Sequence, residues 1–257
     1  MKTAIVTGAA GDIGMANCRV LLDAGFQVAA VDRDADGLAR LEKSLGEHGD
    51  IKGFVSDILS MALVEEMYAS VRDHFGLVTV LVNGAGGITA PSLRQCTEED
   101  WTKDVDLNLN GPWRCQKVVQ DDMIKSGSGV IINIASVNGL AVYGYPGYSA
   151  AKAGLILLTK FTAVELGRFG IRCNAIAPGS VMTEAWQERR DRNPDLADRL
   201  RRWYPQRKFC TADEIANLVG FLVSDAATHM TGEVLRLDGG LSTGQDVMVS
   251  DFIGEDF

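Results

Sequence analysis

The sequence has no long hydrophobic run and no excess of basic residues. None of its apolar runs approaches the roughly 20 residues that a transmembrane helix needs, so we expect no membrane partner. Lysine and arginine number 25 against 34 acidic residues, which gives a net charge of -9 and argues against nucleic acid as a partner. Thr3–Val6 already reads as a strand, so we expect no signal peptide and a cytoplasmic location.

Cysteine and histidine are scarce and scattered. No two of the five cysteines lie within three residues of each other, and the three histidines are far apart in the sequence. This spacing argues against a disulfide framework and against a zinc site, so we expect reduced thiols and no metal. Hydrophobic residues at 46% and charged residues at 23% are near the globular average, which excludes disordered and fibrous classes.

Short β-branched runs alternate with segments of helical periodicity along the chain. Strands are expected at Thr3–Thr7, Phe26–Val31, Ile51–Val55, Val78–Val82, Val130–Ala135, Ile171–Ala177 and Glu233–Leu237. Helices are expected at Ile13–Ala24, Ala35–Glu47, Ser60–Phe75, Gly111–Lys125 and Ala153–Phe169. The alternation predicts one α/β domain over residues 1–257, a Rossmann-type doubly wound sheet of seven mostly parallel strands with helices on both faces.

Two segments interrupt this rhythm. Residues 184–208 are polar and hold seven of the sixteen arginines, with Asp195–Arg199, Asp198–Arg202 and Glu188–Arg192 as i,i+4 pairs. We expect a mobile substrate lid that buries little apolar area, and an arginine contact to a substrate anion is the alternative interpretation. Residues 241–257 form an acidic tail with several apolar side chains, which we expect to pack on a neighbouring subunit.

The first expected strand runs into a glycine-rich turn, Thr7-Gly8-Ala9-Ala10-Gly11-Asp12-Ile13-Gly14, and a helix follows. Such turns place backbone N–H groups and a helix N-terminus against a pyrophosphate. The residues expected to bind it are Gly8, Gly11, Asp12, Ile13 and Gly14. Asp32 closes the next strand, where a carboxylate accepts from a ribose and repels a 2′-phosphate. Arg33 offsets part of that repulsion, and the balance favours NAD over NADP.

Tyr148 and Lys152 lie four residues apart, so a helix places both side chains on one face. A free tyrosine is a poor base at neutral pH, and a fixed cation beside it lowers its pKa. Ser136 follows an expected strand, and the carboxyl end of a strand faces the cleft of an open α/β sheet, so Ser136 is a better candidate than Ser149.

Together and in this order, these motifs resemble the classical short-chain dehydrogenase/reductase family over residues 2–240. The turn is similar to the family's TGxxxGxG with Asp12 at the middle glycine, where aspartate can tolerate a left-handed backbone. It also matches TGxxGxxG, the form of the extended, epimerase-like branch, but the length of 257 residues favours the classical branch.

The resemblance implies further cofactor contacts. Asn83-Gly84-Ala85-Gly86 is similar to the NNAG motif, which supports the sheet and lines the adenosine side through Asn83, Gly84 and Ala85. Asp57, followed by Ile58, matches the position that contacts adenine, although a helix N-cap is an equal alternative for Asp57. The segment after the sixth strand would grip the nicotinamide carboxamide through Pro178, Gly179, Val181 and Thr183.

The resemblance also implies an NAD-dependent alcohol/carbonyl oxidoreductase of EC 1.1.1 type. Tyr148 would take the hydroxyl proton and contact the cofactor, Ser136 would hold the substrate oxygen, and Lys152 would orient the nicotinamide ribose. Asn108 would hold a water beside the lysine, with Asn110 as the competing candidate. The expected substrate-contacting residues are Ser136, Asn138, Tyr143, Tyr148 and Trp186.

The expected substrate is a small polar molecule, namely a sugar, a polyol or an anionic sugar derivative, which places the enzyme in carbohydrate metabolism. The alternative is a 3-oxoacyl thioester reductase of the same family. A non-enzymatic, cofactor-binding regulator would typically lose the tyrosine or the lysine, and this chain keeps both. The helices Gly111–Lys125 and Ala153–Phe169 are apolar on more than one face, so we expect a homotetramer.

Overall fold

The computed structural model describes residues 2–184, 186 and 191–257. Its main sheet comprises β1 (Thr3–Thr7), β2 (Gln27–Asp32), β3 (Ile51–Val55), β4 (Val78–Asn83), β5 (Gly129–Ile134), β6 (Ile171–Pro178) and β9 (Val234–Leu237). The strand order is β3-β2-β1-β4-β5-β6-β9, and every neighbouring pair is parallel. The predicted seven-stranded Rossmann-type domain is confirmed, and each predicted strand lies within one residue of the observed one at both ends.

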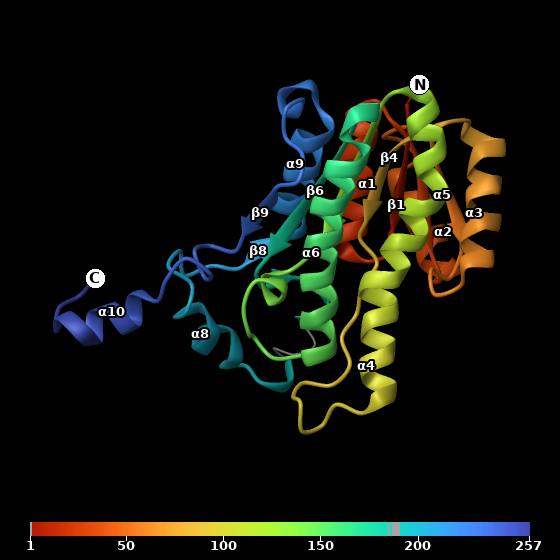
Figure 1. Ribbon diagram of the computed structural model, residues 1–257. Coiled ribbons are helices and arrows are strands. Elements are labelled where there is room, and N and C mark those ends of the chain that lie inside the picture. Colours follow the sequence, from red (N-terminus) through yellow and green to blue (C-terminus); the bar gives the residue numbers. More distant parts are fainter. Residues whose placement is uncertain (1, 185, 187–190) are drawn as a thin grey trace.

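Helices cover both faces of this sheet (Figure 1). One face carries α1 (Asp12–Asp23), α2 (Ala35–Leu45) and α9 (Ala212–Val223), whose buried side chains share one apolar cluster with the sheet. The other face carries α3 (Met61–Phe75), α5 (Gly111–Ser126) and α6 (Pro146–Leu166), which share a second cluster. The strands are therefore buried on both sides, as their near-continuous apolar runs predict.

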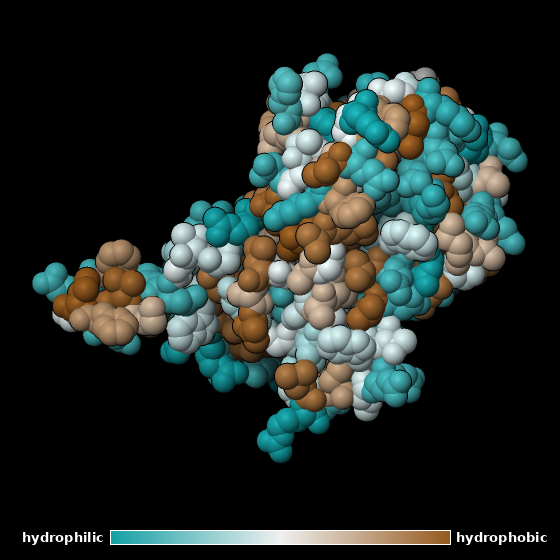
Figure 2. All heavy atoms as spheres, in the orientation of Figure 1, coloured by the Kyte–Doolittle hydropathy of each residue, from teal (hydrophilic) through white to brown (hydrophobic). Residues whose placement is uncertain are grey.

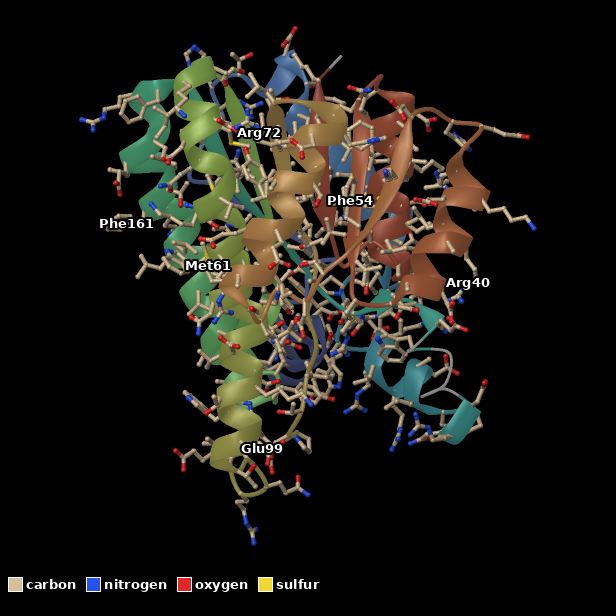
Figure 3. All side chains as sticks on the ribbon, turned by 90° about the vertical axis from the view of Figure 1, so that its right-hand side faces the viewer. Arg40, Phe54, Met61, Arg72, Glu99 and Phe161 are labelled. Atoms are coloured by element: carbon tan, nitrogen blue, oxygen red, sulfur yellow. The ribbon has the colours of Figure 1, made fainter. Side chains whose placement is uncertain are left out.

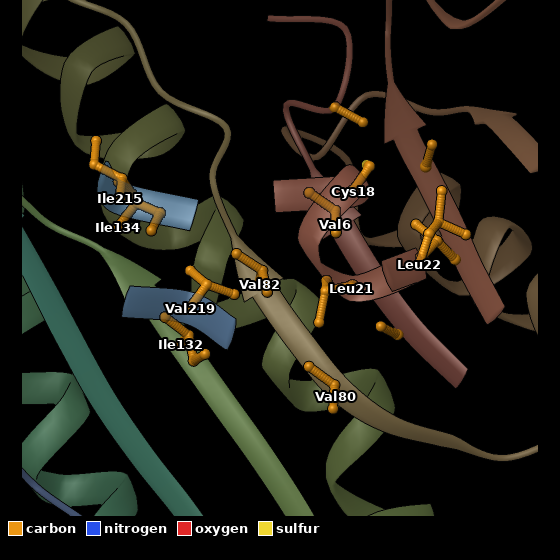
Figure 4. Packing of buried hydrophobic residues seen from close by; sticks show 14 of the residues in the cluster. Val6, Cys18, Leu21, Leu22, Val80, Val82, Ile132, Ile134, Ile215 and Val219 are labelled. Atoms are coloured by element: carbon orange, nitrogen blue, oxygen red, sulfur yellow. The ribbon is translucent and has the colours of Figure 1, made fainter. Parts of the chain in front are cut away.

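The strand residues alternate between the two clusters. Val80 and Val82 of β4 and Ile132 of β5 pack against α1 and α9, as Figure 4 shows, whereas Leu81 and Ile131 face α3 and α5. All five of these side chains are at most 2% exposed. Burying such side chains contributes about 1.5–3 kcal/mol each, so the two layers hold the loops at the sheet edge in fixed positions.

Some elements begin where the sequence pattern did not place them. Helix α6 begins at Pro146, seven residues before the predicted Ala153, with proline at its first position, where the missing N–H costs nothing. A second sheet pairs β7 (Val181–Met182) with β8 (Cys210–Thr211). The chain also forms α4 (Glu98–Val105), α8 (Leu196–Arg201) and α10 (Asp246–Ile253), which the sequence pattern did not predict.

Residues 184–208, in their described part, pack around a small apolar cluster of their own. Tyr204 and Ala197 are buried in it beside Phe209, and the ring centroids of Trp186 and Phe209 lie 5.0 Å apart. The expectation that this segment buries little apolar area is therefore wrong. Of its predicted ion pairs, Asp198 instead meets Arg201 at 2.8 Å, and Glu188 lies outside the described residues.

The tail helix α10 projects from the body and ends near the C-terminus (Figure 1). Figure 2 shows hydrophobic side chains gathered on this projection. Phe252 is 81% exposed, and Met248, Ile253 and Phe257 are also exposed. An ion pair between Arg207 and Asp246 ties the start of the helix to the segment after α8. No helix in the described ranges has the length and apolar character to cross a membrane.

Candidate active site

A cleft of about 690 Å³ lies at the carboxyl ends of the strands around β1 and β4, where the strand order reverses. Ligands of open α/β sheets bind at this point. Most of the residues predicted to bind the cofactor line it, namely Gly8, Gly11, Asp12, Ile13, Gly14, Asp32, Arg33, Asp57, Ile58, Gly84, Ala85 and Thr183. The other predicted ones do not, namely Asn83, Tyr148, Lys152, Pro178, Gly179 and Val181.

The glycine turn is shaped for the close approach of a ligand. Gly8 has a φ of +69°, which favours glycine, and a Cβ added at Gly14 would lie 2.0 Å from the Gly8 carbonyl oxygen. Asp12 has no left-handed backbone; it is the first residue of α1, and Gly11 is the N-cap. The left-handed position expected at Asp12 therefore falls on Gly8 instead. The N-terminus of α1 faces the cleft, where its dipole favours an anionic group.

Two carboxylates border the cleft at the carboxyl ends of β2 and β3. Asp32 accepts hydrogen bonds from the backbone N–H groups of Ala10 and Asp34, each at 3.1 Å, and still lines the cleft beside Arg33. Asp57 accepts from the N–H of Leu59 at 3.0 Å, whereas the N-cap of α3 is Ser60. The helix-cap alternative for Asp57 is therefore wrong. The cleft, its glycines and Asp32 fit a dinucleotide.

Asn83 has a structural place in the sheet. Its side chain is buried and donates to Asn133 Oδ1 of β5 at 2.8 Å. Asn133 in turn donates to Thr159 of α6 at 2.9 Å. This chain of amides joins β4, β5 and α6, so Asn83 supports the strand end and leaves the backbone of Gly84 and Ala85 to line the cleft.

Tyr148 and Lys152 lie on the first turns of α6. The lysine nitrogen is 5.5 Å from the centre of the tyrosine ring and donates to the Ile134 carbonyl at 2.8 Å. Ser136 follows β5 and hydrogen bonds with Asn138 Oδ1 at 3.4 Å. Gly86 joins this group to the cleft, because it lines the cleft and a Cβ there would lie 3.6 Å from the lysine nitrogen.

Burial governs the titration of the pair. Burial is the largest influence on the pKa of Tyr148 and raises it. The nearby Asp104 carboxylate also raises this pKa, whereas a hydrogen bond with Ser136 lowers it. Burial also lowers the pKa of Lys152 to about 8. The pKa of Tyr148 is therefore raised, and the lowering expected from Lys152 is not found. The three side chains together offer a proton donor or acceptor, a hydroxyl and a cation.

Asn108 lies in a π-helical turn, Asp106–Asn110, between α4 and α5. Its amide donates to the carbonyls of Gly87 at 2.8 Å and Asp104 at 2.9 Å. Its oxygen would lie 2.9 Å from a Cβ at Gly86. Asn110 instead bonds with Asp106 away from this group, at 3.0 Å. Asn108 therefore has the place beside the lysine that the resemblance implies, and Asn110 does not.

The predicted substrate residues fall into two sets. Asn138 donates to the Gly144 carbonyl at 3.0 Å and to Ser149 at 3.1 Å, so it shapes the loop before α6. Tyr143 and Trp186 pack on the edge of the apolar cluster formed by Val137, Ala197, Tyr204, Phe209 and Leu241. Val137, which directly follows Ser136, joins that cluster to the strand end of β5.

Several residues that line the cleft were not predicted, namely Ala10, Val31, Ser56, Leu59, Gly86, Gly87, Ile88, Thr89, Lys103, Asp104, Leu107 and Glu184. The run from Gly86 to Thr89 had a usable signal, because it follows β4 at the carboxyl edge of the sheet. Asp104 had none, since its contact with α6 joins residues 44 positions apart. The backbone N–H of Glu184 donates to Asp12 at 2.7 Å, which ties the segment after β7 to the glycine turn.

Comparison with known proteins agrees with this arrangement. The family model described as enoyl-(acyl carrier protein) reductase matches residues 8–242. An uncharacterized oxidoreductase, C922.06, of Schizosaccharomyces pombe is 37% identical over 99% of this chain and 96% of its own length. A D-threitol dehydrogenase of Mycolicibacterium smegmatis is 35% identical over 93% and 92%. The 3-oxoacyl-[acyl-carrier-protein] reductase FabG of Thermotoga maritima is 35% identical over 93% and 97%.

Solved structures give the same picture. A short-chain dehydrogenase/reductase family oxidoreductase from Burkholderia thailandensis has a TM-score of 0.93 and 41% identity, covering 100% of this chain and 98% of that one. A xylitol dehydrogenase bound to NAD+ scores 0.89 at 29% identity, covering 93% and 98%. An actinorhodin polyketide ketoreductase with NADPH scores 0.90 at 32% identity, covering 95% and 98%. The chain belongs to the classical short-chain dehydrogenase/reductase family.

Proposed function

We propose that this oxidoreductase transfers a hydride between NAD and the hydroxyl/carbonyl pair of a small polar substrate, either a sugar, a polyol or an anionic sugar derivative. The observation that carries the proposal is the position of Gly86. It lines the cleft that Asp32 borders and also lies against Lys152, so one continuous site joins a ribose acceptor to the group of Tyr148, Lys152 and Ser136.

When bound, the nicotinamide accepts or supplies the hydride. Asp32 binds the adenosine ribose, and Gly8, Gly11 and Gly14 let the backbone approach the pyrophosphate. Asp57, Ile58, Gly84 and Ala85 line the adenine side, while Pro178, Gly179, Val181 and Thr183 border the nicotinamide. The cleft lining supports the proposal for the glycines, Asp32, Asp57, Ile58, Ala85 and Thr183, and Pro178 lies at the end of β6, at the same edge of the sheet.

Tyr148 takes the hydroxyl proton of an alcohol, or gives a proton to a carbonyl oxygen. Ser136 holds the substrate oxygen against the tyrosine, and Lys152 orients the ribose and stabilises the phenolate. Asn108 is held beside the lysine by the hydrogen bonds that its amide donates to the carbonyls of Gly87 and Asp104. A water bound there can pass protons between the lysine and solvent. Asn138, Tyr143 and Trp186 shape the substrate side.

NAD is favoured because Asp32 would face the 2′-hydroxyl of the ribose, and its charge would repel a 2′-phosphate. Among the neighbours, the xylitol dehydrogenase structure holds NAD+ and the ketoreductase structure holds NADPH. The neighbours therefore leave the choice of cofactor open, and the proposal of NAD rests on Asp32, which closes β2 and lines the cleft.

A 3-oxoacyl thioester reductase is the second candidate, because FabG of Thermotoga maritima is as similar to this chain as the D-threitol dehydrogenase. The two activities require different pockets, polar for a polyol and a long apolar channel for an acyl chain. The run of arginines after Thr183 in the sequence favours the polar one. A screen of the purified protein decides between them, with NAD or NADP and sugars, polyols, hydroxy acids and a 3-hydroxyacyl thioester followed at 340 nm. Turnover confined to the thioester with NADP would contradict the proposal.

The proposed enzyme is a cytoplasmic homotetramer of carbohydrate metabolism. Support for the assembly comes from exposed apolar side chains on the outer faces of α5 and α6, where Val164 is 85% exposed, Leu157 67%, Phe161 64% and Trp113 48%. Figure 3 shows Phe161 pointing outward from α6. Apolar side chains gathered in this way mark a contact between proteins. A solution mass near that of one 27.7 kDa chain would contradict the tetramer.

Residues 184–208 are proposed as the substrate lid. They follow β7 directly, and Glu184 lines the cleft. Within this segment, Ala197 and Tyr204 are buried together with Val137, Phe209 and Leu241, which anchors this part of it to the body of the domain. The lid should exchange its amide hydrogens more slowly when cofactor and substrate are bound, and equal exchange with and without them would contradict it.

A further inference from the structure

Asp104 is a buried carboxylate that the proposed chemistry does not use. It lies near the end of α4, and the residue is 1% exposed. Its Oδ2 accepts the backbone N–H of Tyr148 at 3.1 Å. Burial raises the pKa of Asp104, and hydrogen bonds from Thr89 and from the Tyr148 N–H lower it. A buried carboxylate that stays charged makes strong hydrogen bonds, so it holds the Tyr148 N–H and Thr89, which donate to it, in place.

The N-terminus of α6 needs a cap from elsewhere in the fold. The N-cap residue, Tyr145, has a left-handed backbone and makes no side-chain cap hydrogen bond. Pro146 has no N–H to offer, and Tyr148 is the third residue of the helix. The N–H groups of a first helical turn have no partner within the helix and favour a negative charge. Asp104 supplies both an acceptor and a charge from a neighbouring helix.

The chain packs closely around this contact. A Cβ added at Gly147 would lie 3.0 Å from the Cβ of Asp104 and 3.1 Å from its Oδ2, so glycine lets α6 come this near to α4 without displacing the carboxylate. The carbonyl of Asp104 also accepts from Asn108 at 2.9 Å. One residue therefore connects the helix that carries Tyr148, the loop that carries Thr89 and the amide of Asn108.

We propose that Asp104 is a positioning residue for Tyr148: its carboxylate caps the N-terminus of α6 and fixes the tyrosine relative to α4 and the loop after β4. This inference rests on the proposed role of Tyr148. Two titratable groups lie next to Tyr148: the Lys152 nitrogen is 5.5 Å from the centre of its ring, and the Asp104 carboxylate accepts its backbone N–H at 3.1 Å. Ser136 adds a neutral hydroxyl. The negative charge of Asp104 favours the protonated phenol, which is the form that donates a proton to a carbonyl.

The test separates the charge of Asp104 from its hydrogen bond. Asp104→Asn keeps an oxygen that can accept the Tyr148 N–H and removes the charge, whereas Asp104→Ala removes both. Glu99→Gln is the matched control, because it removes one charge from the exposed end of the same helix (Figure 3). The phenol is titrated by its tyrosinate absorbance at 295 nm, as the difference between each protein and its Tyr148→Phe counterpart. This readout needs no substrate.

The midpoint of the Tyr148 titration should lie at lower pH in Asp104→Asn than in the wild type. In Glu99→Gln it should coincide with the midpoint of the wild type. Asp104→Ala should lose about tenfold or more in kcat on the substrate that the screen identifies, with the KM for NAD within about twofold, because misplaced catalytic groups cost rate. An unshifted Asp104→Asn midpoint, or a kcat of Asp104→Ala within about twofold of the wild type, overturns the proposal. If Asp104→Ala does not fold, the Asp104→Asn titration alone decides.

The two proposals fail in different ways. If Tyr148→Phe keeps full turnover, the proposed function is wrong, while the 295 nm titration still reports whether Asp104 controls the phenol. If Tyr148→Phe is inactive and the Asp104→Asn midpoint is unshifted, only the positioning role is wrong.

Discussion

The Nζ of Lys152 donates a hydrogen bond to the carbonyl oxygen of Ile134 at 2.8 Å, so the cation of α6 is anchored on the last residue of β5. The lysine is 4% exposed, and no carboxylate is paired with it among the described ion pairs. A buried cation without an acidic partner opposes folding while it stays charged. The fold therefore carries a destabilising group at the place where the ribose is expected.

Lys152→Met should stabilise the protein at neutral pH. The folded-state pKa of Lys152 is about 8, below its ordinary 10.5, so its destabilisation is full below pH 8 and disappears as the pH rises to 10.5. The expected gain at pH 7 is at most about 3 kcal/mol, since one pKa unit corresponds to about 1.4 kcal/mol. Urea unfolding at pH 7 and pH 9.5 measures it. A gain that does not shrink at the higher pH would contradict the buried charge.

Gly14→Ala should disrupt the glycine turn. Its Cβ would lie 2.0 Å from the Gly8 carbonyl oxygen, so the backbone must move, at a cost of about 1–3 kcal/mol, and NAD binding should weaken with it. Gly11→Ala is the matched control, because its Cβ would lie 3.7 Å from the same oxygen. Thermal unfolding compares the stability of the two variants, and NAD titration measures the loss of binding in Gly14→Ala. Equal losses in the two variants would show that this close approach is not what the turn requires.

Asp32→Ala should weaken NAD binding and narrow the preference for NAD over NADP. The variant loses a charged acceptor, worth about 1.5–3 kcal/mol or roughly tenfold to a hundredfold in affinity, and it loses the repulsion of the 2′-phosphate. Asp36→Ala, at an exposed position in α2 outside the cleft, should change neither. The kcat/KM ratio for the two cofactors is the measurement. If that ratio does not move, Asp32 is not at the ribose.

Removing residues 245–257 should weaken the oligomer or raise the substrate KM. An isolated eight-residue helix is marginal in water, and α10 exposes Phe252 and Ile253, so a neighbouring subunit is its expected support. Phe252→Asp should weaken the same contact while leaving the chain full length. Sedimentation over a concentration series measures the assembly. An unchanged mass together with an unchanged KM in both variants would contradict a role between subunits.

The sequence was sufficient to predict the elements that depend on local pattern. The seven strands follow from β-branched runs, and the turn at Gly8 and the pair of Tyr148 and Lys152 follow from spacing. The start of α6 was missed because Tyr145 and Gly147 lack the usual cap chemistry, and the cap comes from Asp104 across the fold. The buried cluster around Tyr204 was missed because its apolar residues are sparse in sequence and meet only in three dimensions.

The most direct test of the account is the turnover of Tyr148→Phe, which removes only the hydroxyl that exchanges the proton. Its kcat should fall by at least about a hundredfold, the contribution expected of a positioned acid or base, while NAD should bind as in the wild type. In the wild type, the oxidation rate should rise between pH 6 and 9, because the phenolate is the active form and burial raises the pKa of Tyr148. A kcat of Tyr148→Phe within about tenfold of the wild type would contradict the account.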